Sequence, residues 1–317
     1  MSQPTIAIGI HVYANPDRFD RLMQNILWSG VPADIKIRVF EDPKLTDTNQ
    51  EISKRYQKLC EKYNVSYYRA PSWGCIHGIV QFAVMNSPED WFIYVPDDVL
   101  FTKGHFQGVV DHIYKYNHTC AGMFQTPYWN AHEYKPGWPS SDYKYLWTIP
   151  IEKANKFLET VPENPHWSHE DKMPYLYINV NGAGFALRRK VWEEVGGFSP
   201  KTWCFDEDIA VRCLMYSRYH IFAIAGKPSI HLFAGSTLDG TQPQHQFSTL
   251  ESWIKAWGMD KTAICKLSDL AQMPPEGRRP NDINDLPMRK CGLFFDKDKE
   301  NIVNEALAAT GTVRITR

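Results

Sequence analysis

At 317 residues the chain is long enough for one large α/β domain, alone or with an appendage. Hydrophobic residues make up 43% and the formal net charge is −1, so the composition is that of an ordinary globular protein without a basic excess. Nucleic acid is therefore disfavoured as the principal ligand, and seven cysteines without a C-x-x-C pair predict neither a zinc site nor a dense disulfide framework.

The first hundred residues alternate between apolar strand patterns and segments with helical spacing. Strands are expected at 5–12, 35–40, 65–68 and 91–95, and helices at 15–28, 46–63 and 74–85. Because a helix separates each strand from the next, we expect a parallel sheet with right-handed crossovers.

Beyond residue 100 the alternation continues less regularly. Helices are expected at 104–116, 189–195 and 206–219, and extended segments at 121–125, 175–187 and 221–225. Two segments, 126–147 and 159–174, have no period and predict loops, which at this length tend to be functional or disordered. The first loop carries side chains that either stack on an acceptor or pin the loop to the body: Trp129, His132, Tyr134, Trp138 and Trp147.

The most informative stretch is the fourth strand and the two acids that follow it. The apolar run 91–95 leads directly into Asp97 and Asp98, and such a run suits a strand buried on both faces. Ligands of open α/β sheets bind beyond the carboxyl ends of the strands. Two adjacent carboxylates repel each other unless a cation lies between them, and a divalent cation that holds a phosphate-bearing substrate meets this need. The alternative is a strand followed by a solvated acidic turn.

Two further segments resemble a known family. NGAGFALRRKVWEEVGGF at 181–198, followed by FDEDIAVR at 205–212, is similar to a block of the inverting, family-2-like glycosyltransferases that use nucleotide sugars and have the GT-A fold. The resemblance covers roughly residues 5–235. It implies the α/β class and a single Rossmann-like GT-A domain, with a mostly parallel central sheet flanked by helices.

The resemblance, together with the end of the regular α/β alternation past Gly235, divides the chain into a domain and an extension. The GT-A domain is expected at 1–240, with a nucleotide-sugar half at about 1–100 and an acceptor half at about 101–240. A C-terminal helical or irregular extension is expected at 241–317. Its three arginines, which are expected to contact phosphate or to form a solvated basic patch, are Arg278, Arg279 and Arg289.

A metal site follows from the resemblance of VPDDVLF, residues 95–101, to the family's D-x-D strand end. Pro96 replaces the first acid of that motif, so Asp98 is the expected ligand of Mn²⁺ or Mg²⁺ and Asp97 is expected to face the donor sugar or ribose. The resemblance also implies that His231 completes the metal shell, and imidazole is a plausible ligand of manganese. The alternative for His231 is a hydrogen-bonded core residue.

The acidic triplet of FDEDIAVR provides the expected catalytic group. An inverting transfer needs one carboxylate within reach of the acceptor hydroxyl, to take its proton as it attacks the anomeric carbon. The resemblance places this base at Asp208 and makes Glu207 a contact of the acceptor. Asp206 is expected to cap the helix that it begins.

The resemblance places the nucleotide over the ends of the first strands. Val12 and Tyr13 are expected to flank the base, and Asp42 is expected to recognise the base or ribose, with a turn acid before Pro43 as the alternative.

Glycines complete the expected donor site. Gly74 matches a glycine of the family, whereas Ile79-Val80 occupy positions where the family often has Arg-Asn, which leaves His77 as a weak substitute. Gly182 and Gly184 let the backbone approach the donor sugar, or form a bulge at a strand end.

The sequence thus predicts a metal-dependent glycosyltransferase, a hexosyl- or pentosyltransferase, with a nucleotide-diphosphate sugar as donor and a UDP-sugar favoured. A retaining enzyme on the same fold, a sugar nucleotidyltransferase and a non-catalytic carbohydrate-binding relative stay open. The acceptor is expected to be a carbohydrate or another hydroxyl-bearing molecule, and a hydroxylated DNA base is not favoured.

The location of the protein is a separate expectation. No basic-then-apolar leader is visible, and no run approaches the roughly 20 apolar residues of a membrane span. A cytoplasmic protein without a transmembrane segment is therefore expected.

Overall fold

The computed structural model describes residues 3–43, 50–70, 75–119, 121–130, 144–163, 175–177, 180, 182–198, 205–206, 209–210, 213, 217 and 219–232. Several predictions lie outside these residues: those at Gly74, Glu207 and Asp208, the side chain of His77, the loop residues His132, Tyr134 and Trp138, and the extension 241–317 with its three arginines. In the ranges that are described, no helix has the length and apolar character needed to cross a membrane.

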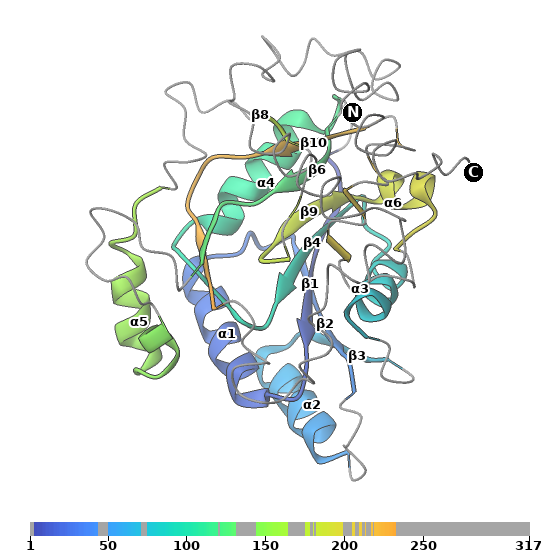
Figure 1. Cartoon of the computed structure of the whole chain (residues 1–317). Coiled ribbons are helices and arrows are strands. Elements are labelled where there is room, and N and C mark those ends of the chain that lie inside the picture. Colours follow the sequence, from blue (N-terminus) through green and yellow to red (C-terminus); the bar gives the residue numbers. More distant parts are fainter. Residues whose placement is uncertain are drawn as a thin grey trace, which may run out of the picture.

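The alternation predicted for the first hundred residues is confirmed (Figure 1). Its elements are β1 (Ile6–Val12), α1 (Pro16–Ser29), β2 (Lys36–Glu41), α2 (Glu51–Tyr63), β3 (Ser66–Arg69), α3 (Cys75–Met85) and β4 (Trp91–Pro96). Beyond them follow β5 (Val99–Phe101), α4 (His105–Tyr116), β6 (Ala121–Gln125), β7 (Tyr128–Asn130), the 3₁₀ helix η1 (Lys144–Trp147), α5 (Ile151–Leu158), β8 (Tyr175–Tyr177), β9 (Phe185–Arg188), α6 (Arg189–Val195), β10 (His220–Ala223) and β11 (Ser229–His231).

The described strands form a large mixed sheet and a small one. The large sheet has the order β3-β2-β1-β4-β9-β6-β10-β8. Strands β3, β2, β1 and β4 run parallel to one another, as do β6 and β10, while β9 is antiparallel to both β4 and β6 and β8 is antiparallel to β10. The expected mostly parallel sheet is therefore confirmed, with β9 as an antiparallel strand between the two parallel groups.

Helices cover both faces of the large sheet (Figure 1). Helices α1, α2 and α4 pack on one face, and α3 and α6 pack on the other. The central strand β4 serves both layers, because Trp91, Ile93 and Val95 point to the first face while Phe92 and Tyr94 point to the second. Complete burial of each such side chain stabilises the folded state by roughly 1.5–3 kcal/mol. Strand β4 is therefore fixed along its whole length, and so is the start of the turn that carries the two acids.

The small sheet corrects the prediction of a continuous loop at 126–147. Strand β11 pairs antiparallel with β5 and parallel with β7, and both β7 and η1 lie within the segment expected to be a loop. Trp129 on β7 is only 3% exposed and packs with Leu100 and Ile230, so its role is to hold this layer and it has no free face for an acceptor. Helix α5, which follows η1, was not expected from the sequence.

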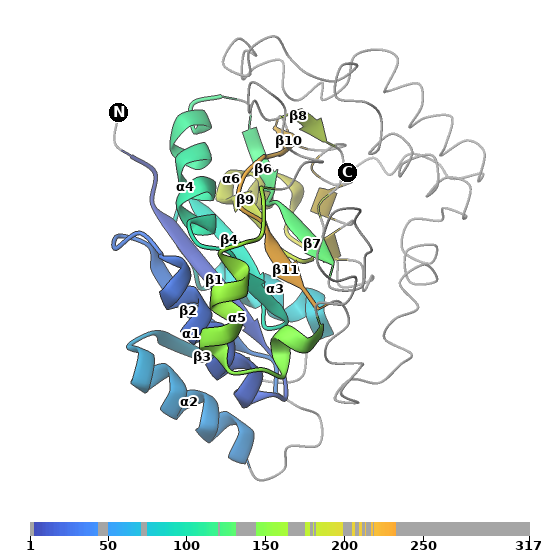
Figure 2. The same ribbon diagram turned by 90° about the vertical axis from the view of Figure 1, so that its left-hand side faces the viewer.

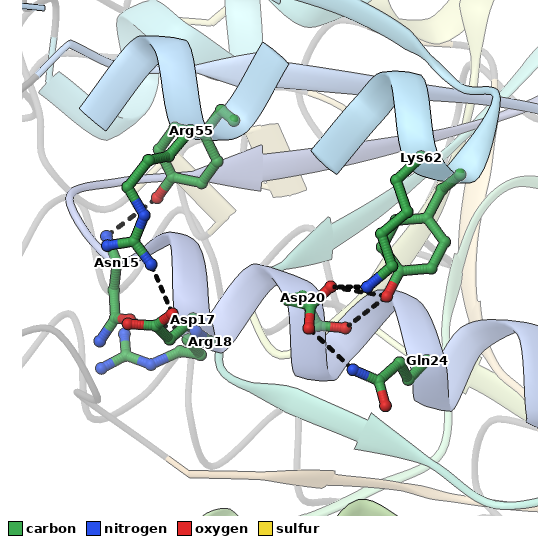
Figure 3. A network of polar contacts seen from close by, with 9 residues as sticks. Asn15, Asp17, Arg18, Asp20, Gln24, Arg55 and Lys62 are labelled. Atoms are coloured by element: carbon green, nitrogen blue, oxygen red, sulfur yellow. Dashed lines mark hydrogen bonds and ion pairs between the residues drawn. The ribbon is translucent and has the colours of Figure 1, made fainter. Parts of the chain in front are cut away.

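Two acids of α1 hold helix α2 in place (Figure 3). Asp17 pairs with Arg55 at 2.5 Å, and Asp20 accepts bonds from Lys62 at 2.8 Å and from the Tyr63 hydroxyl at 2.6 Å. On its other side α1 contacts α5, which lies in front of it in Figure 2, and the Asn25 side-chain amide donates a buried hydrogen bond to the Asn155 side-chain oxygen at 2.9 Å. Helix α1 is thereby fixed relative to both neighbours.

Candidate functional site

Asp97 and Asp98 lie in the short turn between β4 and β5, at the carboxyl end of the central strand. Both are buried, with exposed fractions of 6% and 9%. The pairing of β11 with β5 places His231 opposite Val99, and the Leu232 amide donates to the Asp98 carbonyl at 2.8 Å. This register brings the His231 Nε2 atom to 3.4 Å from Asp98 Oδ1. The two side chains predicted as metal ligands are therefore neighbours.

The donor set of this pair fits a divalent cation of the manganese type. A carboxylate and an imidazole are suitable protein ligands for Mn²⁺, and a cation beside both would balance the buried charge of Asp98. Within the described ranges no group of three or more His, Cys, Asp and Glu side chains is arranged to hold a metal. Two protein ligands leave coordination positions for diphosphate oxygens, which is the usual arrangement for cations that bind together with a phosphate substrate.

Asp97, which was predicted to face the donor sugar or ribose, has side-chain contacts at the start of helix α1. Its Oδ2 atom accepts from the Tyr13 amide at 3.4 Å, and its Oδ1 atom lies 3.6 Å from a guanidinium nitrogen of Arg18. Asn15 holds the start of the same helix, because its side chain accepts from the Arg18 amide at 3.0 Å. Asp97 thus fixes the turn after β1, over which the resemblance places the nucleotide.

The residues predicted to contact the nucleotide base meet at the ends of β1 and β2. The Asp42 amide donates to the Val12 carbonyl at 3.0 Å, and Asp42 and Tyr13 are almost fully buried. The Val12 side chain is completely enclosed in the core with α1 residues, so any contact of Val12 with a base runs through its backbone.

The two glycines predicted beside the donor sugar are held by hydrogen bonds to their backbone. The Gly182 amide donates to Asp206 Oδ2 at 2.6 Å, and the Gly184 carbonyl accepts from the Thr126 hydroxyl at 2.7 Å. Gly184 has φ of 149°, and a Cβ there would lie 3.0 Å from the Thr126 hydroxyl oxygen, so only glycine fits without strain. These bonds fix the turn that precedes β9.

Asp206 does not cap a helix as predicted. Phe205 and Asp206 are both already helical, so the helix begins before Asp206. The Asp206 carboxylate reaches across to Gly182 instead. The neighbouring Glu207 and Asp208, predicted as the acceptor contact and the catalytic base, lie outside the described residues.

Sequence reasoning missed a tyrosine and a histidine at the centre of the site. Burial raises the pKa of Tyr94 well above its usual value, and Asp98, Asp206 and Asp97 raise it further, so the three carboxylates lie around one phenol. The Tyr94 hydroxyl is 3.4 Å from His11 Nδ1. Burial also lowers the His11 pKa to about 4, which nearby Asp98 opposes, so the imidazole is neutral.

A polar residue within the apolar pattern of β1 was the available signal for His11. Its Nε2 atom is excluded from solvent and has no hydrogen-bond partner among the described residues. A buried polar atom without a partner is destabilising, so its retention at the end of a central strand is typical of a functional site.

The comparisons with known proteins agree with this arrangement of the fold. No family model and no curated protein sequence matches the chain. Among solved structures, the mannosyltransferase PcManGT from Pyrobaculum calidifontis, in complex with GDP-Man and Mn²⁺, is similar at 11% identity with a TM-score of 0.51. That match covers 98% of this chain and 76% of PcManGT.

GalNAc-T7, solved with UDP, GalNAc and Mn²⁺, is similar at 14% identity with a TM-score of 0.56. This match covers 98% of this chain but only 57% of GalNAc-T7, so the chain spans little more than half of that protein. At such low identities the likeness concerns the fold. The chain has the mixed α/β fold of the GT-A glycosyltransferases.

Proposed function

We propose that the chain is a metal-dependent glycosyltransferase that moves a sugar from a nucleotide-diphosphate donor to an acceptor hydroxyl, with inversion. The observation that carries the proposal is the pair Asp98 and His231, 3.4 Å apart at the carboxyl end of the central strand of a GT-A fold. Both structural neighbours were solved with Mn²⁺ and a nucleotide or nucleotide sugar, which supports the same class of donor here.

The residues divide the reaction between them. Asp98 and His231 would hold the cation, which would neutralise the charge that develops on the leaving diphosphate. Tyr13 and Asp42 hold the base and ribose, and the turn at Gly182 lies against the sugar. Neutral His11 and the Tyr94 hydroxyl add hydrogen-bonding groups beside Asp98.

We assign the proton transfer to Asp208 by its place in the family block. The acceptor oxygen attacks the anomeric carbon while the bond between that carbon and the diphosphate oxygen breaks. The Asp208 carboxylate takes the proton of the acceptor hydroxyl. Glu207 orients the acceptor. A UDP-sugar is the first donor to test.

The test separates donor binding from chemistry. Wild type is expected to gain thermal stability from UDP-sugar only when Mn²⁺ is present, because a ligand of the native state raises the melting temperature. Asp98→Asn and His231→Gln should lose this gain, whereas Asp111→Asn, an exposed acid on α4, should keep it. Asp208→Asn should keep the gain and lose turnover by roughly 10²–10⁴-fold.

Two results would contradict the proposal. One is a stabilisation by UDP-sugar and Mn²⁺ that persists in both ligand variants. The other is a wild type that binds the donor and never releases UDP with any acceptor, which would point to a carbohydrate-binding relative. The anomeric configuration of the product, read by NMR, distinguishes inversion from retention.

A further inference from the structure

A groove lies along helix α1 beside the η1–α5 segment. Its volume is about 510 Å³, which is in the range of small-molecule sites. One side is formed by polar side chains of α1 between Asn15 and Gln24, and the other by Trp147 of η1 and Ile151 of α5. The two helices that border it are in contact, and α5 lies in front of α1 in Figure 2.

The groove adjoins the candidate metal site through two of its lining residues. Arg18 lies 3.6 Å from a carboxylate oxygen of Asp97, and the Leu232 amide donates to the Asp98 carbonyl at 2.8 Å. A molecule in the groove therefore extends toward the two acids at which we place the donor.

The charges that line the groove are already balanced within the protein. Asp17 pairs with Arg55 at 2.5 Å, and Asp20 pairs with Lys62 at 2.8 Å (Figure 3). The guanidinium group of Arg18 is paired with the Asp97 carboxylate.

Arg21, the second guanidinium of the lining, donates a hydrogen bond to the Leu146 carbonyl of η1. Burial lowers the pKa of Arg21, and Glu152 opposes this effect. The described lining has two acids, Asp17 and Asp20, and two arginines, Arg18 and Arg21, so it has no surplus positive charge and suits an uncharged ligand.

The remaining chemistry of the groove favours a ligand rich in hydroxyl groups. Trp147 is partly buried against the cluster that contains Trp129 of β7 and Ile230 of β11, and it therefore provides a fixed aromatic side chain. The Gln24 amide nitrogen donates to Asp20 at 2.8 Å, which orients its carbonyl oxygen as an acceptor. The Arg21 Nε atom is buried and has no hydrogen-bond partner in the described part of the chain. Aromatic faces and oriented planar polar groups together match the two faces of a sugar ring.

We propose that the groove between α1 and α5 binds the acceptor, and that this acceptor is an uncharged saccharide. The inference rests on the proposed glycosyltransferase function and names the acceptor class for that site. It excludes a DNA acceptor from this groove, since a DNA backbone requires cations that are not already paired.

The test uses the full chain and an array of uncharged oligosaccharides. Wild type should bind a subset of the array, and Trp147→Ala should weaken that binding about tenfold, while Trp147→Phe retains most of it. Trp28→Ala is the matched control, because Trp28 packs against the same core layer but does not line the groove. Its binding should equal that of wild type.

The outcomes separate this inference from the proposed function. If no nucleotide sugar of a panel that includes UDP- and GDP-sugars stabilises wild type in the presence of Mn²⁺, the proposed function fails. If one of them stabilises it but no oligosaccharide binds, or binding is equal in wild type and Trp147→Ala, the inference about the groove is overturned. Transfer of sugar to a duplex containing 5-hydroxymethylcytosine, unchanged by Trp147→Ala, would also overturn it.

Discussion

At the residue scale, the bond between Asp206 and Gly182 links two segments that are far apart in the sequence. The carboxylate accepts the Gly182 amide at 2.6 Å, and Gly182 lies in the turn before β9. Asp206→Ala leaves this amide without its acceptor and should lower the free energy of unfolding by about 1–2 kcal/mol. Asp206→Asn keeps an acceptor oxygen and should lose less than half as much. Urea denaturation measures both, and equal losses would show that the bond is not the cause.

A second residue-scale prediction concerns pH. His105 is fully buried and bonds the Lys227 carbonyl, and burial lowers its pKa to about 4. The unfolded chain takes up a proton near pH 6.5, which the folded chain accepts only near pH 4. Stability should therefore be complete above about pH 6.5 and fall toward pH 4, by up to about 3 kcal/mol.

Substitution identifies the histidine responsible for this effect. His105→Gln removes the titrating group, so its stability should fall less steeply than that of wild type between pH 6.5 and 4. Denaturant titrations across this range provide the comparison. Parallel pH profiles for the two proteins would refute the assignment.

At the element scale, strand β1 depends on a glycine where it lies beside the parallel strand β4. A Cβ at Gly9 would lie 2.2 Å from two ring carbons of Phe92, so an alanine forces the ring or the strand to move. Gly9→Ala should destabilise the protein by about 1–3 kcal/mol, measured by thermal unfolding. Gly108→Ala in α4 is the control, because a Cβ there has open space, and it should stabilise by up to about 1 kcal/mol.

The elements that the sequence predicted well are those set by local patterns. The apolar run of β4 and the acids after it define both the strand and the site, because burial on two faces requires a continuous run. The contact of His231 with Asp98 depends on the pairing of β11 with β5, which no local pattern encodes. The resemblance supplied it instead.

Long-range packing also explains the predictions that failed. Trp129 sits in a short polar and aromatic segment typical of a loop, yet pairing with β11 makes it a strand residue in the core. Asp206 fits a helix cap by residue type, but its carboxylate accepts from the Gly182 amide, which lies in the turn before β9 and not in the helix of Asp206. His11 went unnoticed because its role depends on Tyr94 of the neighbouring strand.

At the scale of the whole molecule, the last described strands complete both sheets. β10 lies between β6 and β8, and β11 lies between β5 and β7. A chain that ends at residue 240 should therefore retain cooperative unfolding, as expected for a GT-A domain at 1–240. A chain that ends at residue 218 lacks two interior strands and should not fold. Circular dichroism during heating tests both, and loss of cooperativity in the longer chain would assign the extension to the same folding unit.

The antiparallel register of β5 and β11 also determines when, during synthesis, His231 can meet Asp98. Side chains alternate between faces, so a slip of one residue would turn the His231 imidazole away from Asp98. A nascent polypeptide that has emerged only as far as β10 contains Asp98 but not its partner. During synthesis, the pair Asp98 and His231 can therefore form only late, after β11 has emerged and paired with β5.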